Sequence, residues 1–134
     1  MRSFSELSGR NILVTGANGF IGTALVRRLR ECGAEVYALV RSDGDHLRWP
    51  SDGRRVTMIV SDFESGFEKS LARRLPKIDF LYHCAASGVS TNRLDDKRLV
   101  LTNLALTKSF LELGLIKEVE RFVTLGSGFE YGFG

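Results

Sequence analysis

Cysteine is scarce in this sequence, and its scarcity limits the kinds of protein that the chain can be. The 134 residues include two cysteines, Cys32 and Cys84, which fall in a predicted helix and a predicted buried strand. Two isolated thiols have neither the spacing of a metal site nor the density of a disulfide-stapled secreted domain. We therefore expect no metal site, reduced thiols and a cytoplasmic location.

A signal peptide and a charge excess of one sign are also missing. Residues 1–10 are polar and lack an apolar core, and we expect no later run to reach the length of a bilayer span. The net charge of +3 is spread over arginine pairs with acids nearby, which is typical of solvated helix and loop faces. We expect a soluble, unexported protein of one domain, with neither a membrane nor a nucleic acid as its partner.

What the sequence does have is a glycine-rich turn between a short apolar run and a segment with helical spacing, at residues 12–22. Gly16 permits a sharp turn off a strand, Gly19 leaves room for a pyrophosphate beside the backbone, and Gly22 lets a helix lie close to the sheet. The unpaired N–H groups at the helix start favour an anion. An ordinary glycine-rich turn is the alternative, but a second strand ending at Val40 favours a dinucleotide site.

The periodicity of the remaining chain predicts an α/β fold. Strands are expected at residues 11–15, 35–40, 56–60, 79–86 and 122–125, and helices from 20 to a cap at Gly33, at 67–75, and at 95–113 with Gly114 as a cap. Inward faces are expected at Ile21, Leu25 and Leu29 with Ala24, and at Leu99, Asn103, Leu106 and Phe110. These elements predict one Rossmann-like domain over residues 1–134, a parallel sheet of strand order 3-2-1-4-5 with helices on both faces, truncated after strand five. Its dinucleotide crevice is expected between strands one and four.

Several separate motifs point in the same direction. Residues 15–22 read Thr-Gly-Ala-Asn-Gly-Phe-Ile-Gly, Asp62 follows strand three, residues 79–86 include a His and two Ala, Asn103 lies in the next helix, and Ser127 precedes a Tyr-Gly pair by four residues. In these features the chain resembles the extended short-chain dehydrogenase/reductase family over most of residues 11–132. The family includes nucleotide-sugar epimerases, dehydratases and 4-keto reductases. The resemblance implies an NAD(P)-dependent enzyme that acts on a nucleotide-activated sugar, with a 4-keto-sugar reductase as the favoured parent activity.

The resemblance also implies which residues form the site. Ser127 is the candidate catalytic residue, because a hydroxyl at the carboxyl end of a parallel strand can bind a reacting carbonyl. The candidate cofactor-binding residues are Gly16, Asn18, Gly19, Phe20, Ile21, Gly22, Arg41, Asp62, Phe63, Ala85, Ala86 and Asn103. Structural roles are the alternatives: Asp62 can cap a helix or close a turn, and the two alanines can permit tight packing. We interpret His83 as a hydrogen-bonded core residue.

One motif of the family is absent from the 134 residues. The resemblance implies a catalytic tyrosine in a Tyr-x-x-x-Lys motif, whereas Tyr131 belongs to the Tyr-Gly pair and Tyr37 and Tyr82 are followed four residues later by Arg41 and Ala86. We therefore expect the chain to hold the first half of the fold and to be inactive alone, with the motif beyond Gly134. A non-catalytic dinucleotide-binding regulator is the rival interpretation.

Strand two ends in Arg41, where an acid usually binds an unphosphorylated ribose. A guanidinium can bind a 2′-phosphate, so we predict a preference for NADP over NAD, and with it a reduction reaction. Asp43 and Asp45 lie near enough in sequence to turn back to the ribose instead. An open edge at strand five and uncovered apolar helix faces predict self-association.

Overall fold

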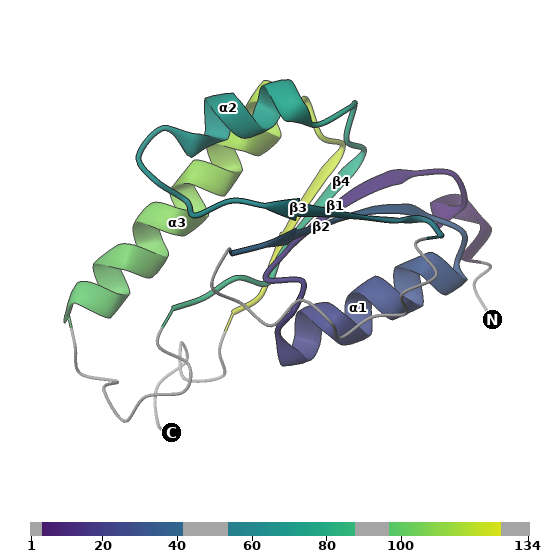
Figure 1. Cartoon of the computed structure of the whole chain (residues 1–134), viewed down its shortest axis with the longest axis horizontal. Helices are drawn as coiled ribbons and strands as arrows, with labels where there is room; N and C mark the ends of the chain where they lie inside the picture. The colour runs from purple at the N-terminus through teal and green to yellow at the C-terminus, as the bar shows by residue number, and fades with distance from the viewer. Residues whose placement is uncertain (1–3, 42–53, 88–96, 127–134) are drawn as a thin grey trace.

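The computed structural model describes residues 4–41, 54–87 and 97–126. Its elements in chain order are the 3-10 helix η1 (Phe4–Leu7), β1 (Asn11–Thr15), α1 (Phe20–Glu31), β2 (Glu35–Val40), β3 (Val56–Val60), α2 (Phe67–Arg74), β4 (Phe80–His83), α3 (Lys97–Ile116) and β5 (Arg121–Thr124). The strands form one sheet of order β3-β2-β1-β4-β5, and every neighbouring pair is parallel. Helix α1 lies on one face, and α2 and α3 lie on the other (Figure 1). The predicted α/β class, strand order and two-sided helix cover are confirmed.

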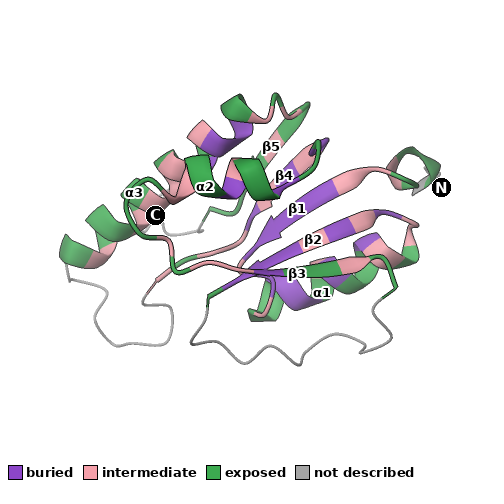
Figure 2. Cartoon of the chain, turned by 45° about the horizontal axis from the view of Figure 1, so that its top comes forward, coloured by how far each residue is buried: buried purple, intermediate pink, exposed green. Residues whose placement is uncertain are grey.

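The central strand β1 supplies side chains to two separate cores. Ile12 and Val14 point to the α1 face, where they pack with Val26 and other buried residues. Leu13 points to the opposite face, where it belongs to a core that includes Leu81, Phe110 and Leu113. Alternation along a strand sends successive side chains to opposite faces, so a strand covered on both sides becomes continuously apolar. Burial is accordingly concentrated in β1 and β2 (Figure 2).

The inward face of α1 agrees with the prediction at Leu29, which is buried, and at Leu25, which packs against the core, but differs at its start. Ile21 is 54% exposed and Ala24 is also exposed, whereas Gly22, Val26 and Leu29 are buried. The physical reason is the position of Gly22, whose hypothetical Cβ would lie 2.0 Å from the carbonyl oxygen of Gly16. Since only a glycine tolerates that approach, the helix is rotated until Gly22 faces the preceding loop.

Helix α3 continues three residues beyond its predicted end, and Gly114 lies inside it. A Cβ at Gly114 would lie 3.3 Å from Cγ2 of Val119 and 3.6 Å from Cδ2 of Phe122. The carbonyl of Gly114 accepts a hydrogen bond from the Val119 amide at 3.0 Å. Gly114 therefore serves close packing against the segment that leads into β5. By contrast, Gly33 after α1 has a φ of 83°, as predicted for a cap.

Helix α3 also corrects the expectation that no run is long enough for a bilayer span. Its 20 residues include an 18-residue window with a mean hydropathy of 1.5, so by length and composition alone it is able to cross a membrane. Several of its apolar side chains are exposed: Val100, Leu101, Leu104, Leu111, Leu115 and Ile116. The opposite side of α3 packs on the sheet through Phe110 and Leu113. The residues predicted to face inward are less exposed than these six side chains: Leu99, Asn103 and Leu106 are half-buried and Phe110 is buried.

Candidate cofactor-binding site

The candidate site lies at the carboxyl ends of β1 and β4. From β1 the chain passes through α1 to β2, which pairs with one side of β1. Strand β4 pairs with the other side of β1, so the direction of the strand order reverses between β1 and β4. Open parallel sheets bind ligands at such a switch point. The loop from Gly16 to Gly19 and the segment from Cys84 to Ser87 leave the two strands side by side at this position.

Gly16 joins the two sides of this crevice by direct backbone approach. Its φ is 62°, in the left-handed region, and a Cβ at this position would lie 2.8 Å from both the Cα and the amide nitrogen of Ala85. The amide of Ala85 donates a hydrogen bond to Oγ1 of Thr15 at 3.1 Å. Position 16 therefore requires glycine, because the loop touches the backbone that follows β4. Ala85 itself is half-buried and Ala86 is exposed, so both the packing role and the cofactor role of the two alanines stay open.

The first turn of α1 presents backbone donors to the crevice. Gly19 is the N-cap residue with an extended φ of −75°, and no side chain caps the helix there. The Gly19 amide donates to the Gly16 carbonyl at 3.0 Å, which folds the loop back on itself. Because the first N–H groups of a helix have no intrahelical acceptor, they are available to an anion, and the helix dipole favours a negative charge there. A Cβ at Gly16 or Gly22 would clash with neighbouring backbone and displace this loop, and the amides that the loop and helix present fit the pyrophosphate of a dinucleotide.

A buried polar chain lies beneath the loop. Oγ1 of Thr15 is 2.8 Å from Nδ1 of His83, and Nε2 of His83 is 3.1 Å from Oγ1 of Thr107 on α3. Since the Thr15 oxygen already accepts the Ala85 amide, its own proton is available to Nδ1, which favours a neutral imidazole with its proton on Nε2. Burial lowers the pKa of His83 to about 4. His83 is therefore a packed, hydrogen-bonded core residue, as interpreted from the sequence.

Asn103 holds the segment after β4 in place. Its Oδ1 accepts the amide of Ser87 at 2.7 Å, and its Nδ2 donates to the carbonyl of the same residue at 3.1 Å. The oxygen and the nitrogen of the Asn103 amide group thus both bond to the backbone of Ser87. Because Asn103 belongs to α3, these bonds hold the segment after β4 against that helix. Direct cofactor contact by Asn103 stays a prediction, while the structure shows that it fixes the segment that follows β4.

The other predicted residues line the same edge of the sheet. Ser61 donates its amide to the carbonyl of Val40 at 3.0 Å, so the turn that follows β3 lies beside the end of β2. Arg41 and Asp62 are exposed there, and Phe63 is half-buried. At the start of α1, Phe20 and Ile21 are 91% and 54% exposed. Asn18 is half-buried within the loop.

Some predicted positions lie outside the described residues, namely Ser127, Tyr131, Asp43 and Asp45. Within residues 4–41, 54–87 and 97–126, no group of three or more His, Cys, Asp or Glu side chains is arranged to hold a metal ion. Cys32 and Cys84 are both free thiols, and burial raises the pKa of Cys84.

The sequence profile of the NAD dependent epimerase/dehydratase family matches residues 12–134, which include the loop, both crevice strands and α3. The chain belongs to this family. A family member of known activity, the dTDP-4-dehydro-6-deoxy-D-allose reductase of Streptomyces bikiniensis, is 42% identical over 108 residues, which are 78% of this chain and 33% of that protein. The chain thus spans about a third of the length of this relative.

Solved structures of family enzymes have the same fold. The epimerase Mth375 of Methanothermobacter thermautotrophicus superposes with a TM-score of 0.79 at 27% identity, over 96% of this chain and 38% of that one. MoeE5, solved in complex with UDP-glucose and NAD, gives a TM-score of 0.70 at 29% identity, over 92% of this chain and 38% of that one. The Rossmann-like fold and the family expected from the motifs are therefore confirmed.

Sequence reasoning did not find the hydrogen-bonded chain from Thr15 through His83 to Thr107. It also did not find the pair of hydrogen bonds between Asn103 and the Ser87 backbone. The polar residues themselves were visible, because Thr15 and His83 end two predicted strands. Their contact depends on the register in which Thr15 lies opposite His83, and that register is a property of the assembled sheet.

Proposed function

We propose that this chain is the cofactor-binding part of an NADP(H)-dependent reductase for a nucleotide-activated 4-keto sugar. The observation that carries the proposal is the glycine loop of Gly16 and Gly19, packed on Ala85 and continued by a helix without a side-chain cap. The identity of 42% to a dTDP-4-keto-sugar reductase supports the substrate class. A bound nicotinamide would supply the hydride.

Each part of the crevice has a distinct task in this proposal. The loop and α1 amides bind the pyrophosphate, and the small residues Ala85 and Ala86 leave space for a flat group at the end of β4. Asn103 keeps the Ser87 segment, and so that space, in place. Ser127 is proposed to hydrogen-bond the sugar carbonyl, where charge develops during reduction.

The preference for NADP rests on Arg41, which directly follows β2 and is exposed at the carboxyl edge of the sheet. A guanidinium can make paired, charge-assisted bonds to a 2′-phosphate. Calorimetric titration of the chain should show NADP binding about tenfold more tightly than NAD, and Arg41→Ala should remove the difference. Arg73→Ala, an exposed arginine of α2, is the matched control. Tighter binding of NAD by the native chain would overturn the preference.

Turnover is proposed to need residues that the 134 positions do not include. The three tyrosines are not followed by a lysine four residues later within the sequence, and acid–base help of this kind is commonly worth about 10²- to 10⁴-fold in rate. We expect the chain to bind NADPH and leave a panel of nucleotide 4-keto sugars unreduced, followed by nicotinamide absorbance. A longer gene product with a Tyr-x-x-x-Lys motif should reduce one of them. Binding without turnover in that product would favour the non-catalytic regulator instead.

Self-association is also proposed, because α3 exposes six large apolar side chains and the sheet has an edge at β5. A sizing measurement during the titrations tests this, since a monodisperse monomer would contradict it.

A further inference from the structure

The hydrogen-bonded chain beneath the glycine loop ends on α3, at Thr107. His83, in the middle of this chain, is 4% exposed, and Thr15 at its other end is fully buried. Two rings flank the imidazole, with centroid distances of 4.9 Å to Phe110 and 6.3 Å to Phe122. Phenyl rings carry no N–H, O–H or carbonyl partner, and a buried polar group costs free energy unless it is hydrogen-bonded. The polar atoms of this chain therefore depend on one another.

The protons of the chain can be assigned by counting donors and acceptors. Burial lowers the pKa of His83 to about 4, so at neutral pH its imidazole has one N–H donor and one acceptor nitrogen. Oγ1 of Thr15 accepts the amide of Ala85 at 3.1 Å, and its own proton can go to Nδ1 of His83 at 2.8 Å. The ring proton is then on Nε2, which lies 3.1 Å from Oγ1 of Thr107. In this arrangement every donor has an acceptor.

The arrangement fails if the hydroxyl of Thr107 is removed. A proton on Nε2 of His83 would then lose its acceptor. With the proton on Nδ1 instead, Oγ1 of Thr15 would accept two donors, and the Thr15 hydroxyl proton would lose Nδ1 as its acceptor. Either tautomer leaves one buried donor unpaired, and a buried donor without a partner is costly. A shift of the strand ends would relieve this cost, because Thr15 and His83 are the last residues of β1 and β4.

We propose that Thr107 is a positioning residue for the dinucleotide: by accepting the Nε2 proton of His83 it lets Thr15 hold the Ala85 amide, and so keeps the glycine loop against the end of β4. Gly16 directly follows Thr15, and a Cβ on Gly16 would lie 2.8 Å from the Ala85 amide nitrogen. A shift at Thr15 therefore displaces the loop whose amides bind the pyrophosphate in the proposed function. The inference rests on that function, and Thr107 acts through His83.

The first measurement determines where the ring proton is. In ¹⁵N NMR spectra of the full chain at neutral pH, without dinucleotide, His83 should show a protonated Nε2 and an unprotonated Nδ1. The chain has a second histidine, His46, and the variant His46→Gln assigns the signals. A proton on Nδ1 of His83 in the native chain would overturn the assignment and the role of Thr107 with it.

The second measurement is the affinity for NADP, by calorimetry on the full chain. Thr107→Val keeps the shape of the side chain but removes the acceptor, and should raise the dissociation constant about fivefold or more and change the His83 ring signals. Thr107→Ser restores the hydroxyl and should recover most of the affinity. Thr102→Val is the matched control, because Thr102 is an exposed threonine of the same helix. It should bind NADP as the native chain does.

Thr107→Cys provides a further variant if Thr107→Val does not fold. A thiol is a weak acceptor, so its affinity should lie between those of the valine variant and the native chain. A structural role alone would lower the unfolding free energy of these variants and leave the affinity of the folded protein unchanged. Native affinity in folded Thr107→Val, or in Thr107→Cys where it takes its place, would therefore overturn the positioning role and leave the proposed function intact. Failure of the native chain to bind NADP would instead refute the proposed function.

Discussion

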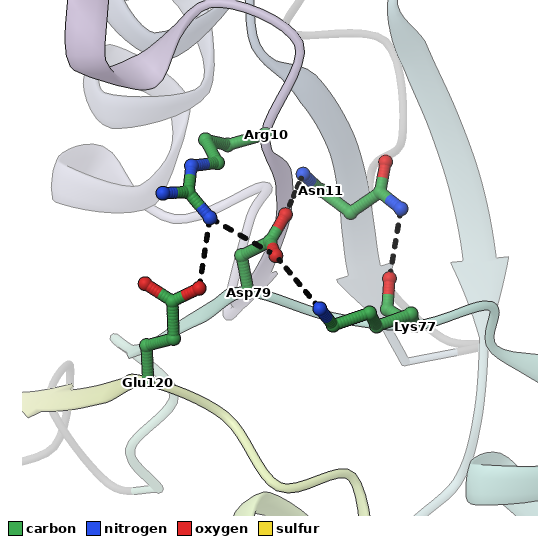
Figure 3. Close-up of polar contacts among 5 residues, drawn as sticks. All are labelled: Arg10, Asn11, Lys77, Asp79 and Glu120. Carbon is green, nitrogen blue, oxygen red and sulfur yellow. Dashed lines mark hydrogen bonds and ion pairs between the residues drawn. The ribbon is translucent and has the colours of Figure 1, made fainter.

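At their amino ends β1 and β4 are joined by charged side chains, whereas at their carboxyl ends they are joined by direct contact between a glycine and an alanine backbone. Figure 3 shows the amino end, where the guanidinium of Arg10 lies 2.8 Å from Glu120 and 3.4 Å from Asp79. The second carboxylate oxygen of Asp79 accepts the amide of Asn11 at 2.8 Å. The hydrogen bond and charge of Glu120, with a smaller contribution from Asp79, raise the pKa of Arg10.

At the carboxyl end the same two strands lead to the Gly16–Ala85 contact, the first turn of α1 and the neutral His83. Protein side chains pair with one another at the amino end, while at the carboxyl end α1 begins without a side-chain cap, so its first amides have no intrahelical acceptor. The comparison teaches that one strand pair can carry ion pairs at one end and, as we propose, a binding site at the other. Variants at the two ends should therefore separate these properties.

The largest effect is expected from Gly22→Ala, which should disrupt the packing of the glycine loop on α1 at the carboxyl end of β1. The added Cβ would lie 2.0 Å from the Gly16 carbonyl oxygen, so the loop must move. We expect a loss of about 4 kcal/mol of unfolding free energy in urea titrations, together with loss of dinucleotide binding. Gly114→Ala is the control, because its Cβ would be 3.3 Å from a valine side chain that can shift. Equal stabilities of the two variants would contradict the packing argument.

A second large effect is expected from acidification, which acts on His83. Its folded-state pKa of about 4 lies below the ordinary value of 6.5, so the unfolded chain binds the proton first. The stability contribution is complete above pH 6.5 and is lost as the pH falls towards 4, by at most about 3 kcal/mol. His83→Asn should give a flatter dependence of unfolding free energy on pH over this window. Parallel curves for the native chain and the variant would exclude His83 as the cause.

The amino end is tested by Asp79→Ala, which should affect stability alone. The buried carboxylate accepts a backbone amide, so its removal leaves the Asn11 donor without this partner. We expect a loss of about 2 kcal/mol of unfolding free energy, with a dinucleotide dissociation constant within about twofold of native. A large change in affinity without loss of stability would reverse the assignment of the two ends. Asp79→Asn, which keeps one acceptor oxygen, should lose less stability.

The sequence was sufficient for elements that local patterns determine. Residues 35–40 and 56–60 form β2 and β3 as predicted, because short β-branched runs between turn residues have few alternatives. The cap role of Gly114 and the inward positions of Ile21 and Ala24 were mispredicted, since each depends on a glycine packed against backbone or side chains that are distant until the chain folds. A pattern of apolar residues cannot show where a missing Cβ is required.

The candidate site follows the same division. The position of the glycine loop at a switch point was predictable from its spacing, because backbone geometry requires glycine there. The Thr15–His83 contact joins residues 68 positions apart, and the Asn103–Ser87 bonds depend on where α3 lies over the sheet. Phe63 was predicted to contact a cofactor, but its left-handed backbone and its ring partners could be found only in three dimensions.

The smallest expected effect sharpens the comparison most, because it should change binding at the carboxyl end with little change in stability. Gly19 has an ordinary extended φ, and its Cβ would lie 3.2 Å from the Gly16 oxygen, a close contact that needs a loop shift of only a few tenths of an ångström. In Gly19→Val the two methyl groups should enter the phosphate space and raise the dissociation constant by at least about tenfold, which is about 1.4 kcal/mol. Calorimetry measures this change.

The control for a β-branched residue in α1 is Ala24→Val, at an exposed position on the same helix. It should bind the dinucleotide as the native chain does, because its side chain lies more than one turn beyond the loop. Valine is a poor N-cap residue, so Gly19→Val should also lose some helix stability, and urea titration separates that loss from the binding change. Unchanged affinity in a folded Gly19→Val variant would mean that the pyrophosphate does not bind at this loop, and the carboxyl end would then need another role.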